Sequence, residues 1–265
     1  MSDLFTEAID YVLILLGGLK MDYFESYKSV IIEKLEKIVE NERDSIKKAA
    51  ELIVDSFLNN GRIYVFGCNH SAIIPQEVYY RAGSLAVYIP LLIPGLNLVN
   101  TKPVLSTFME RNEQFGRDIV LSSRIRKQDV VIIISTSGRN PVPVAFALEI
   151  KKIGSKIIVI TSKKFCRSFP SRHSSGKTLL DIPPDVVIDN LADIGDVSIK
   201  VGNIRMGPVS TITGVFIMHL MSMFVVDIMR TRGINPPVFV SSNVPEGDKV
   251  NKELSNKFED FLKLP

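Results

Sequence analysis

Short apolar runs, rich in β-branched residues, alternate along the chain with stretches whose apolar residues fall at helical spacing. Each run is nearly all apolar, which is typical of strands buried on both faces of a parallel sheet. Because helices and not tight hairpin turns separate the runs, we predict a doubly wound α/β fold, Rossmann-like or flavodoxin-like, with a five-stranded parallel sheet. The predicted strands are Ile63 to Phe66, Ala86 to Ile89, Val130 to Ile134, Lys156 to Ile160 and Val186 to Ile188.

Helical periodicity also marks the first part of the chain and its end. Apolar residues recur at helical spacing between Tyr27 and Leu58, and Gly61 ends this arm. We therefore predict an N-terminal helical extension, residues 1–60, followed by a single α/β domain, residues 61–265. A terminal amphipathic helix is predicted from Lys249 to Leu262.

Two apolar stretches resemble targeting or membrane segments. Tyr11 to Leu19 follows acidic rather than basic residues and contains two glycines, so it matches a signal peptide poorly. Val209 to Val226 carries no charged residue and approaches the ~20 residues that cross a bilayer. Polar residues interrupt this second stretch, so we predict a buried core or interface helix; they are Ser210, Thr211, Thr213, His219 and Ser222.

Composition narrows the compartment and the partners. The 32 basic and 29 acidic residues are interspersed and leave a net charge of +3, so no broad positive surface for nucleic acid is indicated. Cys68 and Cys166 are too few for a disulfide framework. We expect a globular cytoplasmic protein that has neither nucleic acid nor a membrane as its partner.

The most informative loop follows the third predicted strand. Its hydroxyl groups, its glycine and the proline at the next helix start suit an anion such as phosphate, because exposed amides at a helix start attract negative charge. Alternatively, its serines and asparagine serve only to cap that helix. We call it the serine loop: Ser135, Thr136, Ser137, Gly138, Arg139, Asn140 and Pro141.

Two other loops reach the same edge of the predicted sheet, where the carboxyl ends of parallel strands bind ligands. The first loop runs from Gly67 to Ser71, and the third segment, Gly207 to Thr213, places hydroxyl groups at another helix start, where helix capping is the alternative role. A dinucleotide site would need a glycine where Asn69 stands, so we exclude a nicotinamide or flavin cofactor. The sequence Gly176-Lys177-Thr178 lacks the strand, loop and helix context of a nucleotide-binding P-loop.

Taken together, these segments resemble the sugar isomerase domain family, and most closely its phosphosugar-binding branch. The resemblance covers most of the chain, and the order and variety of the matching segments make coincidence improbable. The matching segments are Val65 to Ser71 (VFGCNHS), Glu77 to Gly83 (EVYYRAG), Ser135 to Pro141 (STSGRNP), Ser171 to Lys177 (SRHSSGK), Gly207 to Thr211 (GPVST) and Pro236 to Asn243 (PPVFVSSN).

The resemblance implies a binding site for a phosphorylated sugar. The serine loop would hold the phosphate, and residues of the other two loops would lie near the sugar. This chain departs from the commonest family pattern at Asn69, where glycine is usual. Such domains generally form dimers or larger oligomers, in which one subunit completes the site of another, so a homodimer or homotetramer is expected. The implied binding residues are Gly67, Asn69, Ser71, Ser135, Thr136, Ser137, Asn140, Ser210 and Thr211.

Enzymes of this family include aldose and ketose phosphate isomerases and an etherase, whose reactions begin with removal of a proton beside a carbonyl. A sheltered carboxylate can serve as the base without a metal or another cofactor. Glu77 is the first candidate, although it could simply pair with Arg81 one turn later. His70 is the first candidate for the second proton transfer, because a loop histidine titrates near neutrality.

Other titratable residues are further candidates for the catalytic roles. His173 is a second histidine in a loop, whereas His219 falls inside an apolar helix and is set aside. Glu110 and Glu113 follow the second predicted strand, where the etherase resemblance implies another carboxylate, and surface ion pairing is their alternative role.

Three functions remain open from the sequence. The leading hypothesis is a sugar-phosphate isomerase that acts by metal-free acid and base chemistry. The second is a phosphosugar sensor without catalysis, although the residues before Gly61 contain no basic recognition helix of a DNA-binding regulator. The third is a sugar-phosphate etherase or lyase.

Overall fold

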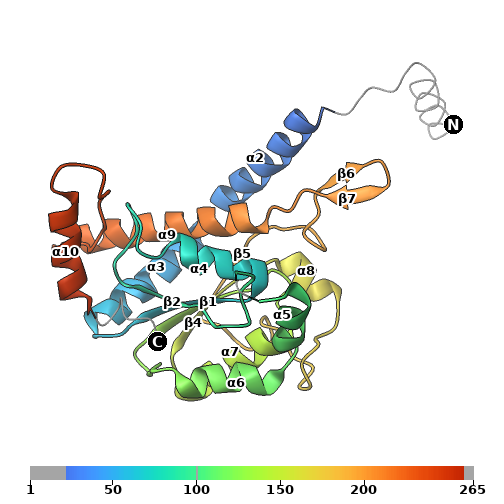
Figure 1. Ribbon diagram of the computed structural model, residues 1–265, viewed down its shortest axis with the longest axis horizontal. Helices are drawn as coiled ribbons and strands as arrows, with labels where there is room; N and C mark the ends of the chain where they lie inside the picture. The colour runs from blue at the N-terminus through green and yellow to red at the C-terminus, as the bar shows by residue number, and fades with distance from the viewer. Residues whose placement is uncertain (1–21, 100, 260–265) are drawn as a thin grey trace.

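A parallel sheet of five strands, in the order β2-β1-β3-β4-β5, forms the centre of the molecule (Figure 1). The computed structural model describes residues 22–99 and 101–259. The strand order is that of flavodoxin-like folds and confirms the predicted class. The strands are β1 (Ile63–Gly67), β2 (Tyr88–Leu91), β3 (Val130–Ile134), β4 (Lys156–Thr161) and β5 (Val186–Asp189).

Helices cover both faces of this sheet. On one face lie α3 (Arg43–Leu58), α4 (Ile73–Glu77) and α9 (Ser210–Thr231), and on the other lie α6 (Glu113–Ser122) and α7 (Pro141–Ile153) (Figure 1). Alternate residues of each strand enter the two cores: Val65 joins the first, whereas Phe66 joins the second and stacks on Phe146 with ring centroids 4.2 Å apart. Burial on both faces explains why the strands read as continuous apolar runs.

The second strand begins two residues later than predicted. We expected it to start at Ala86, but the backbone N–H of Ala86 donates to Pro237 and Leu85 pairs with Val238 in the C-terminal segment. A strand at the sheet edge can also contain Pro90, because one row of its backbone groups needs no partner.

The remaining elements include a short antiparallel hairpin that was not predicted. Its strands have three residues each and are mostly exposed, so they lack the apolar run by which the other strands were found. Gly202, with φ of +57°, lies at its turn, and a Gly-Asn pair is a hairpin signal in the sequence. The elements are α2 (Tyr23–Asn41), the 3-10 helix η1 (Asn69–Ala72), α5 (Pro103–Glu110), α8 (Lys163–Ser168), β6 (Ile199–Val201), β7 (Ile204–Met206) and α10 (Gly247–Lys257).

Helix α9 is long and apolar enough to cross a membrane by length and composition alone. It nevertheless packs along α3, with further contacts to α2 and α4, and buries residues such as Ile217, Met221 and Val225. On this side it is a core helix, as predicted. The other apolar stretch, Tyr11 to Leu19, and the end of the predicted terminal helix lie outside the described residues.

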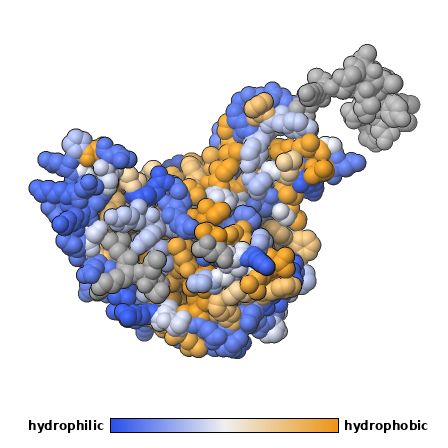
Figure 2. Space-filling view, in the orientation of Figure 1, coloured by the Kyte–Doolittle hydropathy of each residue, from blue (hydrophilic) through white to orange (hydrophobic). Residues whose placement is uncertain are grey.

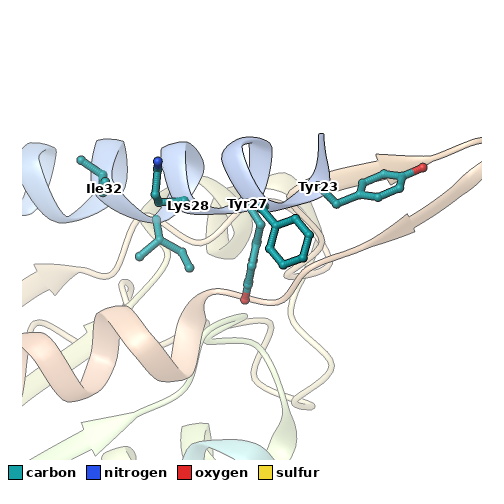
Figure 3. Close-up of a pocket in the computed structure, with 6 residues that line it drawn as sticks. Tyr23, Tyr27, Lys28 and Ile32 are labelled. Carbon is teal, nitrogen blue, oxygen red and sulfur yellow. The ribbon is translucent and has the colours of Figure 1, made fainter. Parts of the chain in front are cut away.

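Helix α2 and the β6–β7 hairpin project beside each other from the α/β body (Figure 1). Apolar side chains gather on these projecting elements (Figure 2), and Phe24 is 90% exposed. A shallow cavity of about 450 Å³ lies along α2, where Tyr23, Tyr27, Lys28 and Ile32 follow one another on the helix (Figure 3). The Tyr27 hydroxyl donates to the backbone oxygen of Pro208 at 2.6 Å, which ties α2 to the segment before α9.

Candidate functional site

A polar cavity of about 300 Å³ lies beyond the carboxyl ends of β1 and β3. These two strands lie side by side where the strand order reverses, which is the place where open α/β sheets bind ligands. The cavity brings together residues from seven separate segments of the chain. Its lining residues are Cys68, Asn69, His70, Ser71, Glu110, Ser135, Thr136, Ser137, Arg139, Asn140, Phe165, Arg172, Asp196 and Ser210.

The backbone of the serine loop presents unused donors to this cavity. The N–H of Ser135 donates to Ile160, and that of Gly138 donates back to Ser135. Those of Thr136, Ser137 and Arg139 have no acceptor among residues 22–99 and 101–259. Successive free N–H groups next to the start of α7 form an anion-binding concavity.

Gly138 fixes the shape of the serine loop. Its φ is +60°, and a Cβ at this position would lie 2.7 Å from Sγ of Cys166. A side chain there would be strained by the backbone conformation and would also collide with α8. The glycine is therefore required by the turn itself and by the close approach of α8.

The hydroxyl groups of the serine loop remain able to donate. Ser135 Oγ accepts from the N–H of Gly138 at 3.3 Å, and Thr136 Oγ1 accepts from Asn190 Nδ2 at 3.2 Å. Ser137 Oγ has no partner in the part of the chain that the structure describes. Hydroxyl hydrogens and backbone N–H groups thus converge on one side of the cavity, as a phosphate would require.

In the first loop, Asn69 takes over the backbone conformation usual for glycine. Its φ is +52°, which asparagine tolerates better than most residues. Its N–H donates to Leu96 at 2.6 Å and is not free for a ligand. Gly67 is not among the lining residues, and it packs so closely on the first loop that a Cβ there would lie 2.4 Å from the backbone oxygen of Ser71. Ser71 itself lines the cavity.

Glu110, the last residue of α5, is the half-buried carboxylate of the cavity. Asn69 Nδ2 donates to its Oε2 at 2.7 Å, and Asn140 approaches from the serine loop. Burial raises the pKa of Glu110 above its ordinary value of 4.5, although both amides and the Arg172 cation act in the opposite direction. A carboxylate of this kind can accept a proton from a bound ligand.

His70 and Ser210 complete the polar lining. His70 is exposed at the cavity edge, where it can reach a ligand. Ser210 also lines the cavity, but its hydroxyl donates to Asp196 Oδ2 at 2.6 Å, and Asp196 also accepts from the first N–H groups of α9. Thr211, predicted beside Ser210, is not among the lining residues.

The sequence pattern of the SIS domain, the sugar isomerase domain, matches residues 26–162 of this chain. The chain belongs to the SIS domain family. A UPF0309 protein of Listeria innocua is 39% identical to it over 241 residues, which cover 90% of this chain and 97% of the relative. A UPF0309 protein of a Geobacillus species is 37% identical over 242 residues, with coverage of 91% and 97%.

A solved structure supports the same fold. A phosphoheptose isomerase from Francisella tularensis superposes with a TM-score of 0.50 at 19% identity, over 77% of this chain and 97% of that one. At this identity the comparison concerns the SIS fold only. The resemblance inferred from the sequence motifs is therefore confirmed at the level of family and fold.

Glu77, the first candidate for the base, lies outside the cavity of this SIS chain. We expected a helix that contains both Glu77 and Arg81, but α4 ends at Glu77 and only the ion pair between the two side chains persists. His219 Nε2 lies 3.6 Å from Glu77 Oε1. Burial and the Arg81 cation lower the pKa of His219. A histidine that the sequence led us to set aside thus pairs with the predicted base on the outer side of α4 and α9.

Glu113 and His173 also lie outside the cavity, where they pair with each other. His173 Nε2 is 3.4 Å from Glu113 Oε2, and Glu113 accepts from the hydroxyl of Ser174 at 2.7 Å. Nδ1 of the buried His173 accepts from the N–H of Ser175 at 3.0 Å. These contacts attach the segment that carries Arg172 to the start of α6.

Protonation of the buried His173 ring should destabilise the folded chain. Burial lowers the pKa of His173 below its ordinary value of 6.5, more than Glu113 raises it. The unfolded chain therefore binds more protons than the folded chain, and this contribution to stability is lost as pH falls through about 6.5. We expect the free energy of unfolding in urea to fall between pH 7.5 and pH 5.5, and to fall less in His173→Gln.

Burial also lowers the pKa of His219, so part of the pH dependence of the free energy of unfolding should remain in His173→Gln. An equal pH dependence in the two proteins would contradict the role given to His173.

Several lining residues were not singled out from the sequence. Asp196 and Phe165 follow β5 and β4, in segments without a recognisable motif, and only the folded chain brings them to the cavity. Arg139 and Arg172 stand inside quoted family segments, but nothing in their spacing predicts that they meet. Within the described ranges, His, Cys, Asp and Glu side chains form no group of three that could hold a metal ion.

Proposed function

We propose that this SIS protein binds a phosphorylated sugar in the cavity and isomerises it between aldose and ketose forms. The observation that carries the proposal is the pairing of unused N–H and hydroxyl donors in the serine loop with the half-buried carboxylate of Glu110. The first element suits a phosphate and the second suits proton abstraction from a carbon acid. A volume of about 300 Å³ suits a small ligand of this class.

In the proposed reaction, the serine loop fixes the phosphate and leaves the carbonyl end of the sugar toward Glu110. Glu110 removes the proton from the carbon beside the carbonyl and later returns it to the neighbouring carbon. His70 transfers the proton between the two sugar oxygens, because imidazole can donate and accept near neutral pH. The likeness of fold to a phosphoheptose isomerase is in keeping with a substrate of this class.

We propose further that the protein forms a homodimer or homotetramer in the cytoplasm. The pair of Glu77 and His219 lies on a side of α9 that also carries exposed apolar residues such as Ile212 and Met223. An exposed apolar face around the partly buried contact of Glu77 and His219 favours contact with a second copy. In such an assembly Glu77 and His219 can face the cavity of the partner subunit. Sedimentation of the full chain tests this, and a monomer at micromolar concentration would contradict it.

The test of catalysis is hydrogen exchange in deuterium oxide. The full chain is incubated with a panel of aldose and ketose phosphates of six and seven carbons, and label is sought at the carbon beside the carbonyl. Label and interconversion are the expected result. Tight calorimetric binding without exchange would support a sensor, and release of lactate from a lactyl ether of a sugar phosphate would support an etherase.

A further inference from the structure

Two arginines line the same side of the cavity. Arg139 belongs to the serine loop, and Arg172 comes from the segment after α8. The backbone N–H of Arg172 donates to the backbone oxygen of Arg139 at 3.0 Å, so the two residues are held next to each other. The fold therefore places two positive charges together at the cavity.

Neutral groups and not carboxylates hold these two side chains. Arg139 Nε donates to the backbone oxygen of Pro170 at 2.8 Å, and its guanidinium lies over the ring of Phe169, 5.3 Å from the ring centroid. Arg172 Nη1 donates to Asn140 Oδ1 at 3.1 Å. In the described part of the chain neither forms an ion pair, and most of their N–H donors remain unused.

Asn140 separates Arg172 from the carboxylate of the cavity. Its amide oxygen accepts from Arg172, while its amide group also approaches Glu110. Arg172 is therefore not neutralised by a direct contact with Glu110. Burial and the adjacent Arg172 cation lower the pKa of Arg139, as expected for two like charges without an anion between them.

The phosphate of the proposed ligand already has donors in the serine loop, so the arginine pair is available for a different group. We infer that the ligand is a sugar phosphate with a second acidic group, a carboxylate or a second phosphate, which Arg139 and Arg172 bind together. This inference rests on the proposed binding of a phosphosugar and narrows its class. Planar guanidinium groups with several free donors suit both anions.

Calorimetry with two matched pairs of ligands tests the inference. Sorbitol 6-phosphate and 6-phosphogluconate share an open carbon chain and differ in a terminal hydroxymethyl or carboxylate group. Fructose 6-phosphate and fructose 1,6-bisphosphate differ in the second phosphate. We expect the full chain to bind at least one diacidic ligand about tenfold or more tightly than its monoacidic partner, because charge-assisted hydrogen bonds are the strong ones.

The double variant Arg139→Gln with Arg172→Gln should remove this preference and leave binding of the monoacidic ligands within about twofold. Arg167→Gln is the control, since Arg167 is exposed on α8 and does not line the cavity. Equal affinities within both pairs would overturn the inference and leave the proposed function standing. If the double variant bound all ligands equally more weakly, the arginines would be assigned to the phosphate, and the inference would also be overturned. Binding of no phosphorylated ligand would overturn the proposed function and the inference together.

Discussion

Glu110→Gln should reduce deuterium exchange into a bound sugar phosphate by ~10² to 10⁴-fold, the range that a positioned general base contributes. The amide keeps the shape of the side chain but cannot accept the proton. In the parent protein the exchange rate should rise with pH through the elevated pKa of Glu110, because only the ionised carboxylate acts as a base. The variant should lack this rise. Exchange at steady state, followed by NMR at several pH values, measures both effects.

Glu51→Gln is the matched control for this prediction. Glu51 is exposed on α3 and does not line the cavity, so its replacement should leave the exchange rate unchanged. Glu77→Gln tests the alternative, in which Glu77 and not Glu110 is the base. If Glu110→Gln keeps the parental rate while Glu77→Gln loses it, the base belongs to the pair of Glu77 and His219 and acts from a partner subunit.

Replacement of both Ser135 and Ser137 by alanine should weaken the binding of phosphorylated ligands by ~100-fold or more. Each hydroxyl would donate a charge-assisted hydrogen bond of ~1.5 to 3 kcal/mol to the phosphate. Unphosphorylated fructose should bind equally to the parent and the variant. Calorimetry with fructose 6-phosphate, inorganic phosphate and fructose measures the difference.

The same double variant should lose ~1 kcal/mol of stability, because Ser135 Oγ is buried and accepts from the N–H of Gly138. Urea unfolding separates this loss from the loss of affinity. Ser168→Ala, at the exposed end of α8, is the control. Undiminished affinity for phosphorylated ligands in the double variant would place the phosphate elsewhere in the molecule.

The serine loop and Asn69 illustrate how far local sequence reasoning extends. The loop was found from its hydroxyl groups, its glycine and its proline, because these residues act through their own backbone and that of their neighbours. Because asparagine replaces the usual glycine at position 69, the sequence left the backbone conformation there open. The structure shows that Asn69 adopts the positive φ that glycine would have. Its further role as a donor depends on Glu110, which ends α5 and comes 41 residues later in the chain.

Which carboxylate lies buried in the cavity could not be deduced in this way. Glu77 and Glu110 both follow strands that reach the same sheet edge, so the sequence offers both. The early end of α4 leaves Glu77 beside His219, while α5 carries Glu110 to the amides of Asn69 and Asn140. Only packing decides which carboxylate is desolvated, and desolvation is what raises the pKa of Glu110.

The sequence by itself determined the parallel sheet, the family and the glycine-containing turn after β3, because apolar runs, glycine and proline act over a few neighbouring residues. The tertiary structure alone decided that Arg139 and Arg172 share one side of the cavity, that Asp196 accepts a hydrogen bond from Ser210, and that Glu113 and His173 contact each other. These relations join segments that are distant in the chain, and no local preference of the backbone encodes which distant side chains come into contact.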